Sequence, residues 1–234
     1  MNFKNFFLRI EKKIRITIAT NYLRNHNLLN IIESSSSNKV TTGIDLYDFY
    51  LIAKIIKDKK VNTVLELGCG RSSFLIAECL KRYSKKPLLI SMEENSYYYE
   101  KQKECFPFEQ YPFTKLILSQ RKQKKYSFFI GWGYDKVPDY NYDLVFVDGP
   151  FTKDDDKIYD DEPDRMNFDL LDVVLKSKRR LTAIIDGRAA TRKAYEILFK
   201  DNYKFIKSMG VGLINDIDIN SLKVTKSNRK KNYD

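Results

Sequence analysis

Residues 64–70, Val-Leu-Glu-Leu-Gly-Cys-Gly, constrain the fold of this chain more than any other segment. A short apolar run delivers the carboxylate of Glu66 into a Gly-x-Gly turn made of Gly68, Cys69 and Gly70, and a helix-like segment follows. Glycine lets a backbone turn sharply and approach a ligand closely, and the first N–H groups of a helix attract an anionic group. This strand–turn–helix unit predicts an α/β protein that binds a nucleotide-like cofactor at the turn.

Two classes of cofactor compete for this turn. The dinucleotide fingerprint Gly-x-Gly-x-x-Gly needs a third glycine where Ser73 stands. The acid before the first glycine is not part of that fingerprint, and it suits a cofactor that carries a positive charge, such as the ammonium of an amino-acid moiety. We therefore expect Glu66 to face such a group, with help from the N–H groups near Ser72 and Ser73.

A second carboxylate follows the next apolar run. Residues 88–92 are typical of a buried strand, and Glu93 and Glu94 come directly after it. They lie about 20 residues beyond the glycines, the spacing at which α/β nucleotide sites place an acid on ribose hydroxyls. Glu93 is the first choice for this role and Glu94 the alternative. An acidic pair that is only solvated at a helix start, where the helix dipole favours it, is the competing interpretation.

Two later strands also end in aspartates. Residues 144–147 form a continuous apolar run, which is typical of a parallel strand covered on both faces, and Asp148 follows it. Residues 181–185 end in the same way at Asp186. Since functional groups in open α/β sheets gather beyond the carboxyl ends of the strands, both aspartates could converge on one site. Alternatively, Asp186 only caps the helix that follows it.

These motifs together resemble the class I S-adenosylmethionine (SAM)-dependent methyltransferases. Residues 66–70 are similar to the first motif of that family, Met92 and Glu93 to its ribose-binding acid, and residues 143–148 to its fourth motif. The resemblance implies a Rossmann-like fold, an α/β architecture with a mostly parallel seven-stranded sheet and helices on both faces. It also implies SAM as cofactor, bound by Glu66, Gly68, Cys69, Gly70, Ser72, Ser73, Glu93 and Asp148.

A narrower similarity connects the chain with glycan-directed O-methyltransferases, which include the plant glucuronoxylan 4-O-methyltransferases. The similarity implies a sugar hydroxyl, in a polysaccharide or its precursor, as the methyl acceptor. That branch carries a histidine before the late strand-end aspartate, whereas Ile185 stands there in this chain. The residues that carry the similarity are 65–73, 91–93, 147–150, 164–166 and 186–188.

The residue inventory restricts how a hydroxyl could be activated. Methyl transfer mainly requires alignment of the acceptor with the methyl group, but a hydroxyl must also lose its proton to a base or to a metal-assisted step. The single histidine, His26, is far in sequence from the motifs, so Asp148 is the leading candidate for the catalytic base. A divalent metal ion shared by Asp148 and Asp186 is the rival hypothesis, because hard cations bind carboxylate oxygens.

Two further segments could contact the acceptor. Residues 153–165 form a long charged loop after the strand that ends at Asp148, and such loops often act as lids or clamps. Within it, Arg165 is a candidate for binding an acidic substrate group, because guanidinium pairs with carboxylates. Residues 126–140 carry Trp132 and several tyrosines, which would either stack on an acceptor or plug the edge of the sheet.

Hydrophobic periodicity gives an alternating pattern that predicts a doubly wound sheet. We expect an amino-terminal basic amphipathic segment with a Ser-rich linker over residues 1–40, a SAM-binding domain over 41–222, and a disordered basic tail over 223–234. The Ser-Ser-Ser-Ser-Asn stretch at 34–38 is predicted to be a hinge. The expected helices span 3–24, 45–57, 73–83, 95–105, 167–176 and 189–200, and the expected strands 61–67, 88–92, 115–119, 142–148, 181–185, 203–207 and 212–217.

The chain carries a net charge of +11, which favours anionic partners. An RNA methyltransferase is therefore an alternative, although the Asp/Asn-Pro-Pro-aromatic loop of base-directed enzymes is absent. The amino-terminal helix could lie on an anionic membrane or pack on the domain. Three cysteines give no paired disulfide framework, and Arg9 interrupts the first apolar stretch too early for a signal peptide. These features predict a cytoplasmic protein that could be peripheral to the inner membrane face.

Two hypotheses from other classes remain. A nicotinamide oxidoreductase would use the same cleft, but the third glycine is missing. A non-catalytic Rossmann-like module would keep the fold and use its basic faces for assembly. The presence of both Glu66 and Glu93 argues that cofactor binding is retained. The sequence thus predicts a SAM-dependent O-methyltransferase with Asp148 and Arg165 at the reaction.

Overall fold

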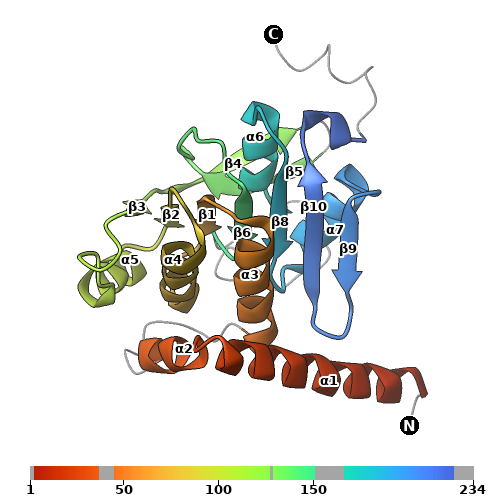
Figure 1. The fold of residues 1–234 in the computed structure, drawn as a ribbon. Coiled ribbons are helices and arrows are strands. Elements are labelled where there is room, and N and C mark those ends of the chain that lie inside the picture. The colour runs from red at the N-terminus through yellow and green to blue at the C-terminus, as the bar shows by residue number, and fades with distance from the viewer. Residues whose placement is uncertain (1–2, 37–44, 127–128, 151–165, 224–234) are drawn as a thin grey trace.

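A computed structural model of the chain describes residues 3–36, 45–126, 129–150 and 166–223 (Figure 1). Its central sheet has seven strands in the order β3-β2-β1-β6-β8-β10-β9. All neighbouring pairs are parallel except those of β10, which runs antiparallel to β8 and β9. The strands are β1 (Thr63–Leu67), β2 (Leu88–Glu93), β3 (Thr114–Leu118), β6 (Leu144–Val147), β8 (Leu181–Ile185), β9 (Tyr203–Ile206) and β10 (Val211–Ile217). The predicted doubly wound, mostly parallel seven-stranded sheet is confirmed.

Helices cover both faces of this sheet because its strands are apolar on both sides. Val64 points into an apolar cluster with α3 (Leu46–Lys59) and α4 (Arg71–Tyr83). Leu65 points into a second cluster with α6 (Asp169–Lys176) and α7 (Ala189–Leu198). This alternation follows from the period of two in a strand, and every residue of β6 is buried as expected for a central parallel strand. A 3-10 turn, η2 (Ile219–Ser221), follows β10.

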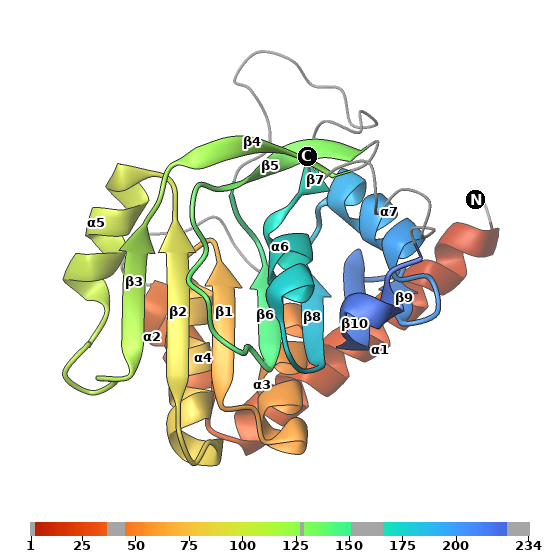
Figure 2. The same cartoon turned by 90° about the horizontal axis from the view of Figure 1, so that it is seen from above.

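A second, three-stranded sheet was not expected from the sequence. It consists of β4 (Arg121–Tyr126), β5 (Phe129–Tyr134) and the short β7 (Met166–Asn167), in the order β4-β5-β7. Figure 2 shows β4 and β5 crossing above the ends toward which β1 and β2 point. The sequence pattern does not predict this hairpin, because β4 carries charged residues on both faces and β5 contains glycines, which lower strand propensity. Because β7 forms, α6 begins at Asp169 and not at 167.

Two helices precede the domain and pack on it. Figure 1 shows α1 (Phe3–Asn25) and α2 (Leu29–Ser36) as an outer layer beneath α3 and α4. Ala19 and Leu23 of α1 are fully buried in the same apolar cluster as α3. The predicted hinge at 34–38 begins within α2, where Ser34 and Ser35 donate their hydroxyl protons to backbone carbonyls one turn earlier. The amino-terminal helix therefore packs on the domain along one side.

Three predicted features fall mainly or wholly outside the described residues. They are the charged loop with Arg165, the second part of the Ser-rich linker, and the basic tail beyond residue 223. Among the helices that the structure describes, none has the length and apolar character needed to cross a bilayer.

Candidate functional site

The glycine turn after β1 packs directly against the turn after β6. Gly68 has a φ of +95° and donates its N–H to the carbonyl of Met92 at 2.9 Å. A Cβ on Gly68 would lie 2.9 Å from the nitrogen of Gly149, and a Cβ on Gly149 would lie 2.7 Å from the Cα of Gly68. Only glycine fits a backbone contact this close. The two glycines therefore bring the predicted cofactor turn next to Asp148.

Glu66 is fully buried and holds the start of α4 in place. The Ser72 hydroxyl donates to its Oε1 at 2.5 Å and the Ser73 hydroxyl to its Oε2 at 2.6 Å, while the Ser91 hydroxyl also donates to Oε2. Ser73 in turn accepts the N–H of Gly70 at 3.1 Å. Both carboxylate oxygens of Glu66 are thus engaged within the protein. The structure gives this residue a positioning role for the turn, and its direct contact with a cofactor stays a prediction.

Glu93 lies at the carboxyl end of β2, beside the glycine turn. Its Oε1 accepts the backbone N–H groups of Glu94 at 3.1 Å and Asn95 at 3.0 Å, and the Cys69 thiol donates to its Oε2 at 3.4 Å. Burial raises the pKa of Glu93 to about 7, and the nearby Glu94 carboxylate adds to the shift. The helix α5 (Ser96–Cys105) continues the chain from here. The two sequence-predicted groups, Cys69 and Glu93, are therefore in contact.

Asp148 follows β6 at the centre of the same edge. Its N–H donates to the carbonyl of Leu67 at 2.8 Å, and about one-third of its side chain is exposed. Burial raises the pKa of Asp148 to about 6, the Arg188 guanidinium at 3.7 Å lowers it, and the Asp186 carboxylate raises it. A carboxylate that is ionised near neutral pH and partly accessible can accept a proton from an acceptor hydroxyl.

Asp186 and a residue that sequence reasoning missed, Asp48, complete this group of acids. Asp48 lies in the first turn of α3, is fully buried, and neither of its oxygens accepts a hydrogen bond from the described residues. Burial and, to a lesser extent, the Asp186 carboxylate together raise the pKa of Asp48 to about 9. Its only signal in the sequence is a charged residue within an otherwise apolar helix start.

The predicted metal site finds no support in the ligand geometry. The described part of the chain holds no group of three or more His, Cys, Asp or Glu side chains arranged to bind a metal ion. Asp148 and Asp186 influence each other's pKa, so they do lie close together. Their neighbour Arg188 supplies positive charge where the hypothesis placed a cation, and its Nη1 donates to the carbonyl of Pro150 at 2.9 Å. Arg188 is a further site residue that the sequence prediction omitted.

The aromatic side chains of residues 126–140 were predicted either to stack on an acceptor or to plug the edge of the sheet. Phe129 and Tyr134 are buried in the apolar core, and the Tyr134 hydroxyl lies 3.1 Å from the carbonyl of Met92 and 3.2 Å from Oε2 of Glu94. These rings close the edge of the site beside β2. Trp132 stays half-buried, with the Arg121 guanidinium 4.9 Å from its ring centroid. Its role in stacking on an acceptor stays a prediction.

The buried carboxyl groups predict a specific dependence of stability on pH. The pKa of Glu66 is raised by burial to about 7, so the folded protein binds protons more tightly than the unfolded chain does. The contribution of Glu66 to stability is therefore fully present below the ordinary pKa of glutamate and is lost as the pH rises through about 7. For Glu66 alone the loss is about 3 kcal/mol, since each pKa unit corresponds to about 1.4 kcal/mol. Glu93 and Asp148 shift in the same direction.

Urea unfolding measures this effect. We expect a higher free energy of unfolding at about pH 5 than at about pH 8, and a smaller difference in Glu66→Gln. Glutamine does not ionise; its single amide oxygen accepts serine hydroxyls on one side and its NH2 group donates on the other. If the free energy of unfolding changed equally with pH in Glu66→Gln and in the wild type, the pH dependence of stability would come from other groups.

Comparison with known proteins identifies the fold of the chain. No protein-family model matches the chain, and no curated protein sequence matches it. Among solved structures, the chain is similar to a candidate caffeoyl-CoA O-methyltransferase of Staphylococcus aureus, with 14% identity, a TM-score of 0.56, and coverage of 89% of this chain and 100% of that one. The chain is also similar to the SAH-bound methyltransferase PaMTH1 of Podospora anserina, with 13% identity, a TM-score of 0.53, and coverage of 93% of this chain and 97% of that one.

The chain adopts the Rossmann-like fold of these methyltransferases. A cofactor-bound protein from MTB, Rv0187, has the same arrangement at 9% identity, with a TM-score of 0.51 over 82% of this chain and 89% of that one. Identities this low bear on the fold, because one fold can host unrelated activities. The function has to be argued from the site.

Proposed function

We propose that this chain is a SAM-dependent O-methyltransferase whose acceptor is a sugar hydroxyl. The observation that carries the proposal is the order of groups on three adjacent strands. The glycine turn follows β1, Glu93 is the last residue of β2 on one side, and Asp148 follows β6 on the other. Open α/β sheets bind nucleotide-like ligands at this kind of edge.

The electrostatics of the edge favour a cationic cofactor. Although the whole chain is strongly basic, burial raises the pKa of Glu93, Asp148, Asp186 and Asp48 above their ordinary values. Repulsion by a neighbouring carboxylate adds to the shift, from Glu94 for Glu93 and from Asp186 for Asp148 and Asp48. A positive charge bound among these carboxyl groups would relieve the repulsion. SAM, when bound, supplies a methyl group on a positively charged sulfur, so the donor set fits this cofactor.

The residues then have distinct roles. Glu93 accepts hydrogen bonds from the ribose hydroxyls, and the turn from Gly68 to Gly70 holds the methionyl end together with N–H groups near Ser72 and Ser73. Glu66 positions that turn through the serine hydroxyls. Asp148 accepts the acceptor's hydroxyl proton, and Arg188 keeps Asp148 ionised.

Two features of the chain bear on the class of acceptor. The glycan-directed resemblance of the motifs favours a sugar, and the named activity of the S. aureus structure, O-methylation, agrees with a hydroxyl acceptor. RNA is the alternative acceptor, favoured by the net charge of +11. Arg165, predicted to bind an acidic group of the acceptor, lies outside the described residues.

Calorimetric titration with S-adenosylhomocysteine, with NAD as the control ligand, tests the cofactor. We expect micromolar binding of the first and no heat from the second. Binding of NAD alone would instead support an oxidoreductase, and binding of neither by folded protein would support a non-catalytic module. Labelled SAM offered with acidic oligosaccharides and with RNA then decides the acceptor class.

A further inference from the structure

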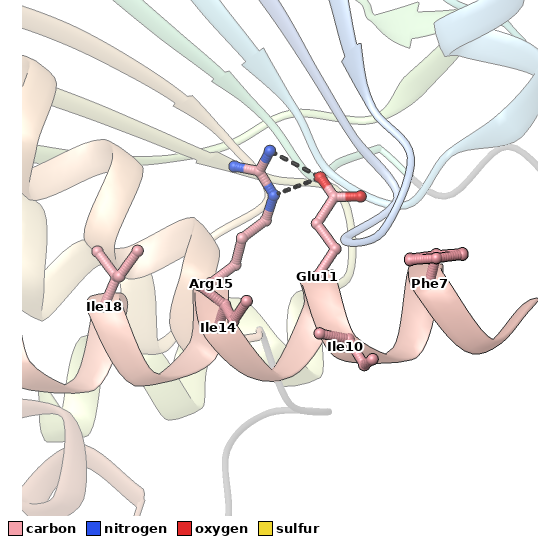
Figure 3. Close-up of a pocket in the computed structure, with 6 residues that line it drawn as sticks. All are labelled: Phe7, Ile10, Glu11, Ile14, Arg15 and Ile18. Carbon is pink, nitrogen blue, oxygen red and sulfur yellow. Dashed lines mark hydrogen bonds and ion pairs between the residues drawn. The ribbon is translucent and has the colours of Figure 1, made fainter.

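The helix α1 presents an exposed apolar face along its amino-terminal half. Phe7, Ile10, Ile14 and Ile18 recur at three- and four-residue spacing and are 39% to 57% exposed. Figure 3 shows them along α1 beside the ion pair of Glu11 and Arg15. They share a shallow pocket on the surface of the helix. A continuous row of large exposed aliphatic side chains marks an interaction surface.

Other side chains of α1 contact the domain. Ala19 is buried against α3, the Arg15 guanidinium donates to the Tyr47 hydroxyl at 3.0 Å, and Lys12 pairs with Asp45 at 3.8 Å. These contacts fix the rotation of α1 about its axis. The apolar face therefore stays turned outward, and its direction is set relative to α3.

The charge of α1 indicates what this surface meets. The helix contains six basic residues and one acidic residue, and Arg9 and Lys13 are exposed on the same stretch of the helix as the apolar row. A second copy of the chain would bring two such basic helices together, which like-charge repulsion opposes. An anionic surface is complementary both to these side chains and to the net charge of +11.

We propose that α1 binds the surface of an anionic lipid bilayer. Ile10, Ile14 and Ile18, with Phe7, enter the boundary between head groups and acyl chains, while Arg9 and Lys13 contact lipid phosphates. An amphipathic helix rich in basic residues binds in this way, parallel to the membrane plane. The proposal goes beyond the methyltransferase activity and does not depend on it.

Vesicle flotation tests the apolar contribution. The full chain should float with vesicles of phosphatidylcholine mixed with phosphatidylglycerol and stay in solution with vesicles of phosphatidylcholine alone. Ile14→Asp should weaken partitioning by about ten-fold or more, since it places a charge where the proposal has an aliphatic side chain enter the bilayer. Ile197→Asp on α7 is the matched control, because Ile197 is 59% exposed on a different helix, and it should bind like the wild type.

The charge contribution is tested separately. Lys13→Ala should weaken binding to the anionic vesicles by about five-fold, the contribution of one basic residue at such a surface. Lys86→Ala, an exposed lysine between α4 and β2, is the control and should have no effect. Added salt should reduce binding of the wild type.

Three outcomes would overturn the proposal. They are equal binding to neutral vesicles, unchanged binding of Ile14→Asp, and a dimer in sedimentation equilibrium that Ile14→Asp dissociates, which would assign the face to a second copy. Titration with S-adenosylhomocysteine on the same preparations reports the cofactor site independently, so failure of one proposal does not mimic failure of the other.

Discussion

Replacing Asp148 with asparagine is expected to lower turnover by about 10²–10⁴-fold, while the affinity for S-adenosylhomocysteine, which lacks the positively charged sulfur, stays nearly unchanged. The substitution keeps the size of the side chain and removes the group that accepts the hydroxyl proton, and a positioned base contributes rate factors of this order. The contact between Gly68 and Gly149 is made by backbone atoms, so the variant should fold and bind S-adenosylhomocysteine like the wild type.

A pH profile separates loss of a base from loss of packing. The pKa of Asp148 is about 6, so wild-type turnover should rise with pH through that value as the carboxyl loses its proton. This rise should vanish in Asp148→Asn. Asp139→Asn, at an exposed aspartate before β6, is the control and should keep both the rate and the profile. Wild-type turnover in Asp148→Asn would remove this residue from the proton transfer.

Replacing Glu93 with alanine is expected to weaken S-adenosylhomocysteine binding by about 2–3 kcal/mol, or roughly 30- to 150-fold. Hydrogen bonds to a charged group contribute energies of this order, and the alanine leaves the ribose hydroxyls without an acceptor. Titration calorimetry measures the change. Turnover at saturating SAM should fall much less, since Glu93 lies on β2 and Asp148 on the far side of β1.

Two comparison variants make the Glu93 result specific. Glu93→Gln keeps an oxygen for the N–H groups of Glu94 and Asn95, so it separates ligand binding from a loosened start of α5. Glu94→Ala tests the alternative acid, whose Oε2 lies 3.2 Å from the Tyr134 hydroxyl. If Glu94→Ala abolished binding and Glu93→Ala did not, the ribose role would pass to Glu94.

Most of the central sheet was predictable because its determinants are local. β1, β2 and β6 are mainly apolar runs with a carboxylate at or near their carboxyl ends, and the glycine turn lies between β1 and α4 as the spacing predicted. Strand β8 has the predicted bounds, Leu181–Ile185. Helix and strand periodicity reads directly from such segments, because both of their faces are buried and few alternative structures satisfy the pattern.

The β4–β5 hairpin was missed for a physical reason. Arg121–Tyr126 shows no apolar alternation, and the glycines of β5 lower its strand propensity. Those glycines are required by neighbours distant in sequence, since a Cβ on Gly131 would lie 2.1 Å from the carbonyl oxygen of Met166. The sequence pattern of one segment does not reveal a backbone contact with a residue that is distant in the chain.

The sequence by itself determined the fold class, the glycine turn and which strands carry carboxylates at their carboxyl ends, because these depend on residues close together in the chain. Only the tertiary structure decided which side chains share the site. Asp48 reaches it from α3, Arg188 follows β8, and Tyr134 comes from the hairpin. It likewise decided that Glu66 is enclosed by three serines and that one face of α1 stays exposed. The packing of elements that are distant in the chain sets how far each of these side chains is buried and which charges surround it. Neither property can be read from the neighbouring residues in the sequence.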